Sequence, residues 1–263
     1  MNFRVVKALV LKYLYVCSRN TFRALDVFFW PVMDLLIWGF MSIYMMRVTT
    51  SVPKMVPMLI SAIILWNVLY RAQQVVCVAF LDDVWSRNML NIWAAPIRPI
   101  EYVGAGYVVG FMQAFIVVVV MGILAGFFYS YNILELGLHL AILFANLIIM
   151  GWSLGLTVTG LFLRFGPPAE ALAWAVPFIF QPISAVFYPV DILPPWMQTL
   201  AQITPASHVF EGMRELISTG HMNTFHIYAA VGLNLLYMSI AATLFKSFYE
   251  EARKRGFLAK YAA

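Results

Sequence analysis

Charged residues gather at the two ends of this 263-residue chain, and long apolar segments fill the sequence between them. Ten of its 17 lysines and arginines lie within the first 23 and the last 18 residues. Only 11% of the residues are charged while 63% are apolar, and a water-soluble fold needs more charged surface than this to stay dispersed. Helices satisfy their own backbone hydrogen bonds in lipid, so the sequence predicts an all-α integral membrane protein.

Six segments are apolar over the roughly 20 residues that a helix needs to cross the hydrocarbon core. They leave no room for a soluble domain of useful size, so we expect a single transmembrane domain over residues 1–263. The fifth segment contains Pro177 and Pro182 and is expected to be kinked. The predicted spans are 25–46, 56–81, 101–128, 138–163, 170–188 and 226–246.

The basic residues also predict the orientation, because lysine and arginine beside membrane spans stay on the cytoplasmic side. With both basic ends inside, the number of spans must be even, which agrees with six. We therefore expect a multi-pass protein of the cytoplasmic (inner) membrane with both termini in the cytoplasm. The net charge of +5 is interpreted as contact with anionic lipid headgroups and not with nucleic acid.

Two segments outside the spans have the periodicity of amphipathic helices. Within 1–23, residues 3–19 place basic side chains on one arc and apolar side chains on the other, as in a helix that lies in the membrane interface. An extension of the first span is the alternative. Within 82–98, apolar residues recur at i, i+4, i+7 and i+8, which predicts a short helix that lies on the membrane or presses into a groove of another protein. This stripe consists of Trp85, Met89, Ile92 and Trp93.

The segment 189–215 is moderately apolar but is broken by prolines and charged residues. It is too interrupted to be a lipid-facing span, and the predicted topology places it outside the cell. Short re-entrant helices that dip into the outer leaflet and are buried against protein would satisfy both facts.

Taken in order, these elements resemble the permease subunit of type 2 ABC exporters, the ABC-2 family. That family has six spans, an N-terminal interfacial helix, a cytoplasmic coupling helix between the second and third spans, and a broken extracellular re-entrant segment before the last span. The local match is an aromatic-Pro turn, a Leu-Pro-x-Trp step, a later proline and a Glu/Arg ending. Its residues are Phe187, Tyr188, Pro189, Pro194, Trp196, Pro205, Glu211 and Arg214.

The resemblance implies a half-channel that pairs as a homodimer and moves a glycan, lipid-linked or amphipathic substrate out of the cytoplasm. It also implies a separate ABC ATPase subunit that docks on the coupling helix. The chain contains no Walker A pattern, G-x-x-x-x-G-K-[ST], so ATP and Mg are expected on that partner and no cofactor on this chain. The residues implied to contact the ATPase are Trp85, Arg87, Met89, Ile92 and Trp93.

Asp34 and Arg71 are the charges placed deepest in the predicted spans, where an unpaired charge is costly. Positions at equal depth on two antiparallel spans have a constant sum, and Asp34–Arg71 and Arg23–Asp82 share one sum. We therefore predict two ion pairs. Asn67, Arg71 and Gln74 lie at i, i+4 and i+7 on one helix face. They either line a transport path or act as polar contacts between helices.

Other chemistry has little support in the sequence. A membrane-embedded lipid- or glycan-modifying transferase is the alternative function, but it would need a polar catalytic cluster at one interface, and we identify no catalytic residues. A membrane scaffold would not need a coupling-type helix. Asp82 and Asp83 are expected to cap the short helix. No metal site is expected, because His221 and His226 are five residues apart and do not share a helical face.

Overall fold

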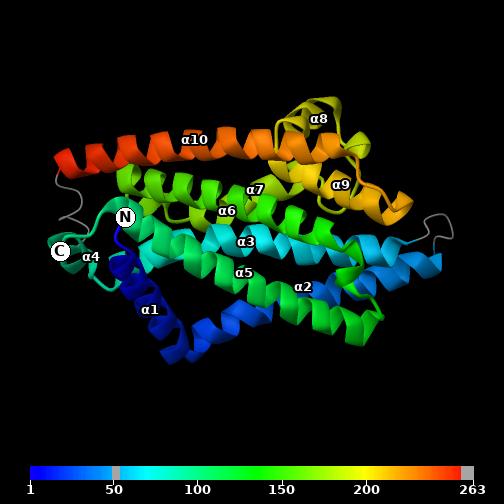
Figure 1. The fold of residues 1–263 in the computed structure, drawn as a ribbon, viewed down its shortest axis with the longest axis horizontal. Coiled ribbons are helices and arrows are strands. Elements are labelled where there is room, and N and C mark those ends of the chain that lie inside the picture. Colours follow the sequence, from blue (N-terminus) through cyan, green and yellow to red (C-terminus); the bar gives the residue numbers. More distant parts are fainter. Residues whose placement is uncertain (49–53, 256–263) are drawn as a thin grey trace.

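In this computed structural model, which describes residues 1–48 and 54–255, the chain folds into a bundle of helices (Figure 1). Within that part of the chain, five helices are long and apolar enough to cross a membrane. They are α2 (Thr21–Val48), α3 (Met55–Trp85), α5 (Pro99–Tyr129), α6 (Leu138–Phe165) and α10 (Thr224–Lys254).

The centre of the bundle is α3, which packs against α2, α5 and α6, while α10 packs on the far side of α6 (Figure 1). The sequence pattern Gly151-x3-Gly155 explains how α6 approaches α3 so closely. A Cβ atom at Gly151 would lie 2.6 Å from the carbonyl oxygen of Leu69, and one at Gly155 would lie 2.9 Å from that of Gln73. Small residues at this spacing allow helices to pack backbone to backbone in lipid.

A short helix replaces the span predicted over 170–188. After a 3₁₀ turn, η2 (Pro167–Ala169), α7 (Leu172–Ile183) has 12 residues, a length of about 18 Å at 1.5 Å per residue. The hydrocarbon core is about 30 Å thick, so α7 alone cannot cross it. The chain leaves the helix at Ser184 and Ala185, and Ala185 has a left-handed φ of 49°, which stops helix propagation.

The broken segment that follows contains η3 (Val190–Ile192), α8 (Pro195–Gln202) and α9 (Pro205–Thr219). Prolines stand at the first helical position of α8 and α9, where the missing N–H costs nothing. Together with α7, these helices carry the chain from the end of α6 to the start of α10 (Figure 1). As a result, α10 ends at the same end of the bundle where α1 begins.

The first helix, α1 (Phe3–Arg19), is separate from α2, because Asn20 between them is extended. The alternative of one continuous first span is therefore excluded. Its buried residues Val6, Leu9 and Tyr13 belong to an apolar cluster with α3, α4 (Met89–Ala94) and α5. The apolar side of α1 thus packs on the bundle itself. A 3₁₀ turn, η1 (Ile133–Leu136), joins α5 to α6 at the opposite end.

Candidate functional site

A groove with a volume of about 730 Å³ lies between α2, α3 and α7, with α1 and α5 contributing to its walls. Its lining runs along α3 from Ile63 to Trp85, a distance of about 33 Å at 1.5 Å per residue. This length matches the roughly 30 Å of hydrocarbon that a bilayer presents. The groove therefore extends along the part of α3 that leads to α4, over a length comparable to the hydrocarbon core.

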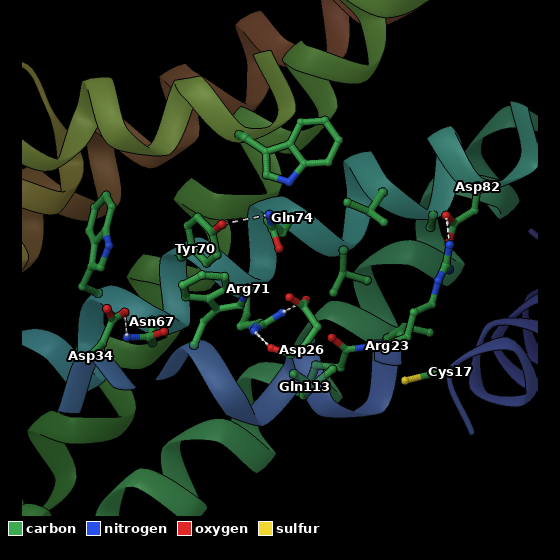
Figure 2. Close-up of a pocket in the computed structure, with 18 of the residues that line it drawn as sticks. Cys17, Arg23, Asp26, Asp34, Asn67, Tyr70, Arg71, Gln74, Asp82 and Gln113 are labelled. Atoms are coloured by element: carbon green, nitrogen blue, oxygen red, sulfur yellow. Dashed lines mark hydrogen bonds and ion pairs between the residues drawn. The ribbon is translucent and has the colours of Figure 1, made fainter. Parts of the chain in front are cut away.

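Helical periodicity places polar and aromatic side chains along the groove. On α2, Asp26, Trp30, Asp34 and Trp38 recur every four residues and all line it, because residues four apart share a helix face. The stripe on α3 includes Trp66, Asn67, Tyr70, Arg71 and Gln74, and α7 adds Trp174, Phe178 and Gln181. Asn67, Arg71 and Gln74 therefore lie in one groove with Asp34, as Figure 2 shows.

Arg71 is paired with Asp26 and not with Asp34, so the predicted Asp34–Arg71 ion pair is wrong. Its Nη2 donates to the carbonyl oxygen of Asp26 at 2.5 Å, and its Nη1 lies 3.4 Å from the Asp26 carboxylate (Figure 2). Equal depth of two Cα atoms does not decide which side chains meet, because the long arginine side chain reaches along the helix toward more polar surroundings. Asp26 provides these, because its side chain is half exposed.

Asp34 has no oppositely charged side chain within ion-pair distance among the described residues. Its carboxylate accepts one long hydrogen bond of 3.4 Å from the Asn67 amide (Figure 2). The same Asn67 nitrogen donates to the carbonyl oxygen of Ile63 at 3.0 Å, so its stronger bond stays within its own helix. Nearby, the Gln74 amide donates to the Tyr70 hydroxyl at 2.9 Å.

The second predicted pair, Arg23–Asp82, is confirmed. Both terminal nitrogens of Arg23 donate to Asp82, one to each carboxylate oxygen (Figure 2). This two-bond geometry is the strong form of an arginine–carboxylate contact. It ties the start of α2 to the end of α3 and closes the row of polar groups at the α4 end of the groove.

Asp83 connects the end of α3 to α1, to α5 and to the residue before α4. Its buried carboxylate binds the Lys12 ammonium of α1, accepts from the Tyr102 hydroxyl of α5 at 2.7 Å and accepts from the Asn88 amide at 3.2 Å. Burial, and then the charge of Asp83, raise the pKa of Tyr13 on α1, which keeps this phenol protonated. Asp82 and Asp83 therefore hold neighbouring helices and do not cap α4, whose N-cap Asn88 makes no side-chain capping bond.

The apolar stripe of α4 faces the bundle, which corrects part of the predicted docking surface. Met89 is 2% exposed and Ile92 is 5% exposed, both packed in the cluster with α1 and α5. Arg87 is exposed and has a left-handed φ of 53°, where the chain breaks between α3 and α4. Trp85 is half exposed, stacks on Trp174 and donates to Glu170 at 3.3 Å. The side chain of Trp93 lies outside the described part.

The Glu/Arg ending of 189–215 holds the turn after α7. Arg214 donates to the carbonyl oxygen of Ala185 at 2.8 Å and to Glu211 at 2.9 Å, and Glu211 also accepts from the backbone N–H of Val190 at 2.7 Å. These contacts satisfy backbone groups that the break in helix leaves open.

The other residues of this motif have separate positions. Phe187 stacks on Trp38 of the groove wall with ring centroids 4.0 Å apart, and the Tyr188 hydroxyl donates to the carbonyl oxygen of Pro182 at 3.1 Å. Pro189 and Pro194 precede η3 and α8, Pro205 begins α9, and Trp196 is exposed. The motif is therefore mainly structural, with Phe187 as its contact to the groove.

Several residues of interest were not identified from the sequence. Asp26 lies near the edge of the predicted first span, where a charged side chain can reach water, so nothing in the sequence indicated an ion pair with a buried arginine. Gln113 of α5 and Gln181 of α7 also line the groove. The Nδ1 atoms of His208 and His226 lie 3.4 Å apart, a contact between two helices that spacing along the chain does not indicate. No group of three or more metal-binding side chains occurs in residues 1–48 and 54–255.

Comparison with known proteins identifies the kind of molecule that carries this groove. The family model described as ABC-2 type transporter matches residues 10–217. A protein of Pyropia yezoensis named as a transport permease, ycf38, is 34% identical over 84 residues. That alignment spans 30% of this chain and 28% of the Pyropia protein, so the family match covers far more of the chain than the relative does.

Proposed function

The chain belongs to the ABC-2 type transporter family as a multi-pass membrane permease subunit, and we propose that it exports a glycan, lipid-linked or amphipathic substrate from the cytoplasm. A separate ATPase subunit supplies the energy, with ATP and Mg bound there. The observation that carries this proposal is the groove, because a strip of charged, amide and aromatic side chains runs between helices that are long and apolar enough to span a membrane. Polar groups in such a position mark substrate pathways.

The groove also supports the proposed homodimer. It is walled by α2, α3 and α7 of one chain, and α2 presents large exposed apolar side chains beside it, among them Phe29, Ile37 and Phe40. A second copy that packs here would complete the wall and cover this surface. The inner membrane, with both ends of the chain in the cytoplasm, is the proposed location, because the end of the bundle that holds α1 and α4 carries most of the basic residues.

The ATPase is proposed to dock at the break between α3 and α4. Because Met89 and Ile92 are buried in the bundle, the surface offered to this partner is the polar one, with Ser86, Arg87 and Asn91 exposed. Trp85 beside it lines the groove and contacts α7. A movement of the ATPase against this break would therefore displace α3 and α7, which form two walls of the groove.

The test is ATP-dependent transport in inverted membrane vesicles that contain the permease and the P-loop ATPase isolated with it from its native membrane. We expect uptake of a glycan or amphiphile that stops when the Walker A lysine of the ATPase is replaced. Arg87→Glu should lower both ATPase binding and uptake while the permease still elutes as a single species. If no ATPase is bound and no candidate substrate is taken up with ATP, the exporter proposal is wrong.

A further inference from the structure

We propose that the groove binds amphiphiles that carry a cationic group, and that the Asp34 carboxylate is the binding residue for that cation. This inference rests on the proposed transport function and names the substrate class for the same groove. Its starting point is the balance of charge. The charged side chains that line the groove are Arg23, Asp26, Asp34, Arg71 and Asp82.

Two ion pairs neutralise four of these five groups. Arg23 is bound by Asp82, and Arg71 is bound by Asp26. Asp34 is left with only a 3.4 Å bond from Asn67, and no ion pair to it exists within residues 1–48 and 54–255. A carboxylate at membrane depth that lacks a countercharge is costly, so a cation that enters the groove gains more from Asp34 than from either paired acid.

Aromatic side chains of α2 and α3 line the groove that contains Asp34. Trp30 and Trp38 lie four residues before and after Asp34 on the same face of α2, and Trp66 and Tyr70 line the groove from α3. The faces of these rings attract ammonium-type cations, most strongly where water is excluded. A carboxylate in a groove lined by aromatic rings is thus suited to an ammonium or phosphonium group, with the apolar part of the ligand along the neighbouring side chains.

An anionic ligand fits this groove poorly. Arg71 is the cation at the same depth, but two of its nitrogens are already bound to Asp26. Its remaining Nε has no hydrogen-bond partner but is itself buried, so a ligand in the groove does not reach it. An anion would be repelled by the Asp34 carboxylate, and a neutral glycan would gain hydrogen bonds from its hydroxyl groups but no ionic interaction.

The experiment measures binding to the purified permease in nanodiscs of neutral lipid, with empty nanodiscs as the blank. The probes are tetraphenylphosphonium and tetraphenylborate, which share size and apolar area but have opposite charge. We expect saturable binding of tetraphenylphosphonium and at least about tenfold weaker binding of it to Asp34→Asn. Asp34→Glu should keep most of the affinity. Asp191→Asn removes the same charge from the exposed η3 and should bind as the unchanged protein does.

Three results would overturn the inference. They are equal binding of both probes, unchanged binding by Asp34→Asn, and no saturable binding of tetraphenylphosphonium. The thermal unfolding midpoint of each variant separates lost binding from lost folding. Because no ATPase is present, these results are independent of the transport assay: ATP-driven uptake of a neutral glycan without cation binding would refute only the cationic substrate class.

Discussion

At the scale of single residues, the effect of removing a charged side chain from the groove depends on whether that side chain has an ionic partner. Arg71 is 3% exposed while its partner Asp26 is half exposed, so the two residues of this pair are not equivalent. Removal of one partner from a buried pair leaves the other charge without compensation. Asp34 is different, because it has no ionic partner to lose among the described residues.

This difference predicts opposite effects for two matched substitutions. Asp26→Asn should destabilise the permease by about 1–3 kcal/mol, because it leaves the buried Arg71 without a countercharge. Asp34→Asn should be neutral or stabilising, since it removes an unpaired charge whose cost in a membrane is about 2.5–3.5 kcal/mol. Thermal unfolding in detergent measures both. Equal destabilisation by the two variants would show that Asp34 is paired after all.

At the scale of elements, three local interactions decide how the helices sit together. The acids Asp82 and Asp83 bind α2 on one side and α1 and α5 on the other. The stripe of α4 and the apolar side of α1 are both buried in one apolar cluster of the bundle, which removes both from the surfaces they were expected to occupy. The pair Gly151 and Gly155 lets α6 approach α3 within backbone contact. Each of these depends on a second element that is distant in the sequence.

The close approach of α6 to α3 gives a prediction with an internal control. Gly151→Ala would place a methyl group 2.6 Å from the Leu69 carbonyl oxygen, which forces two backbones apart and should cost about 1–3 kcal/mol. Gly232 of α10 has nothing within 4 Å of an added Cβ, so Gly232→Ala should be neutral or slightly stabilising because alanine favours helix. Unfolding midpoints compare the two, and a harmless Gly151→Ala would mean that the helices are farther apart.

At the scale of the whole molecule, the start of α1 and the last residues of α10 lie at the same end of the bundle. This is so although the described chain has five helices of spanning length, an odd number. The short α7 and the helices after it provide the remaining passage (Figure 1). The described chain therefore returns to this end without a sixth helix of spanning length. The loop after α5 and the break before α4 then lie on opposite sides.

Cysteine labelling tests this topology. In a background without Cys17 and Cys77, a cysteine at Ser130 after α5 should react with an impermeant thiol reagent added to intact cells. A cysteine at Ser86 should react only in inverted vesicles. Both serines are exposed, so access to the membrane side, and not burial, decides the outcome. Labelling of Ser86→Cys in intact cells would reverse the proposed orientation.

The sequence by itself determined that this is a multi-pass membrane protein, its family and the approximate place of the long helices. These follow from properties that each segment carries alone: apolar length, amphipathic periodicity, proline positions and the distribution of basic residues. The Arg23–Asp82 pair was also predictable, because the shared register of α2 and α3 places these two residues at the same level.

Only the tertiary structure decided which acid binds Arg71, which face of α4 is buried, how short α7 is, and that Asp34 remains unpaired. Arginine reaches past the residue at its own depth, so register along two helices does not select its partner. An apolar stripe fits a partner protein, a membrane or the chain's own bundle equally well, and only the tertiary packing distinguishes them. These outcomes depend on distances between segments far apart in the sequence, which local composition does not encode.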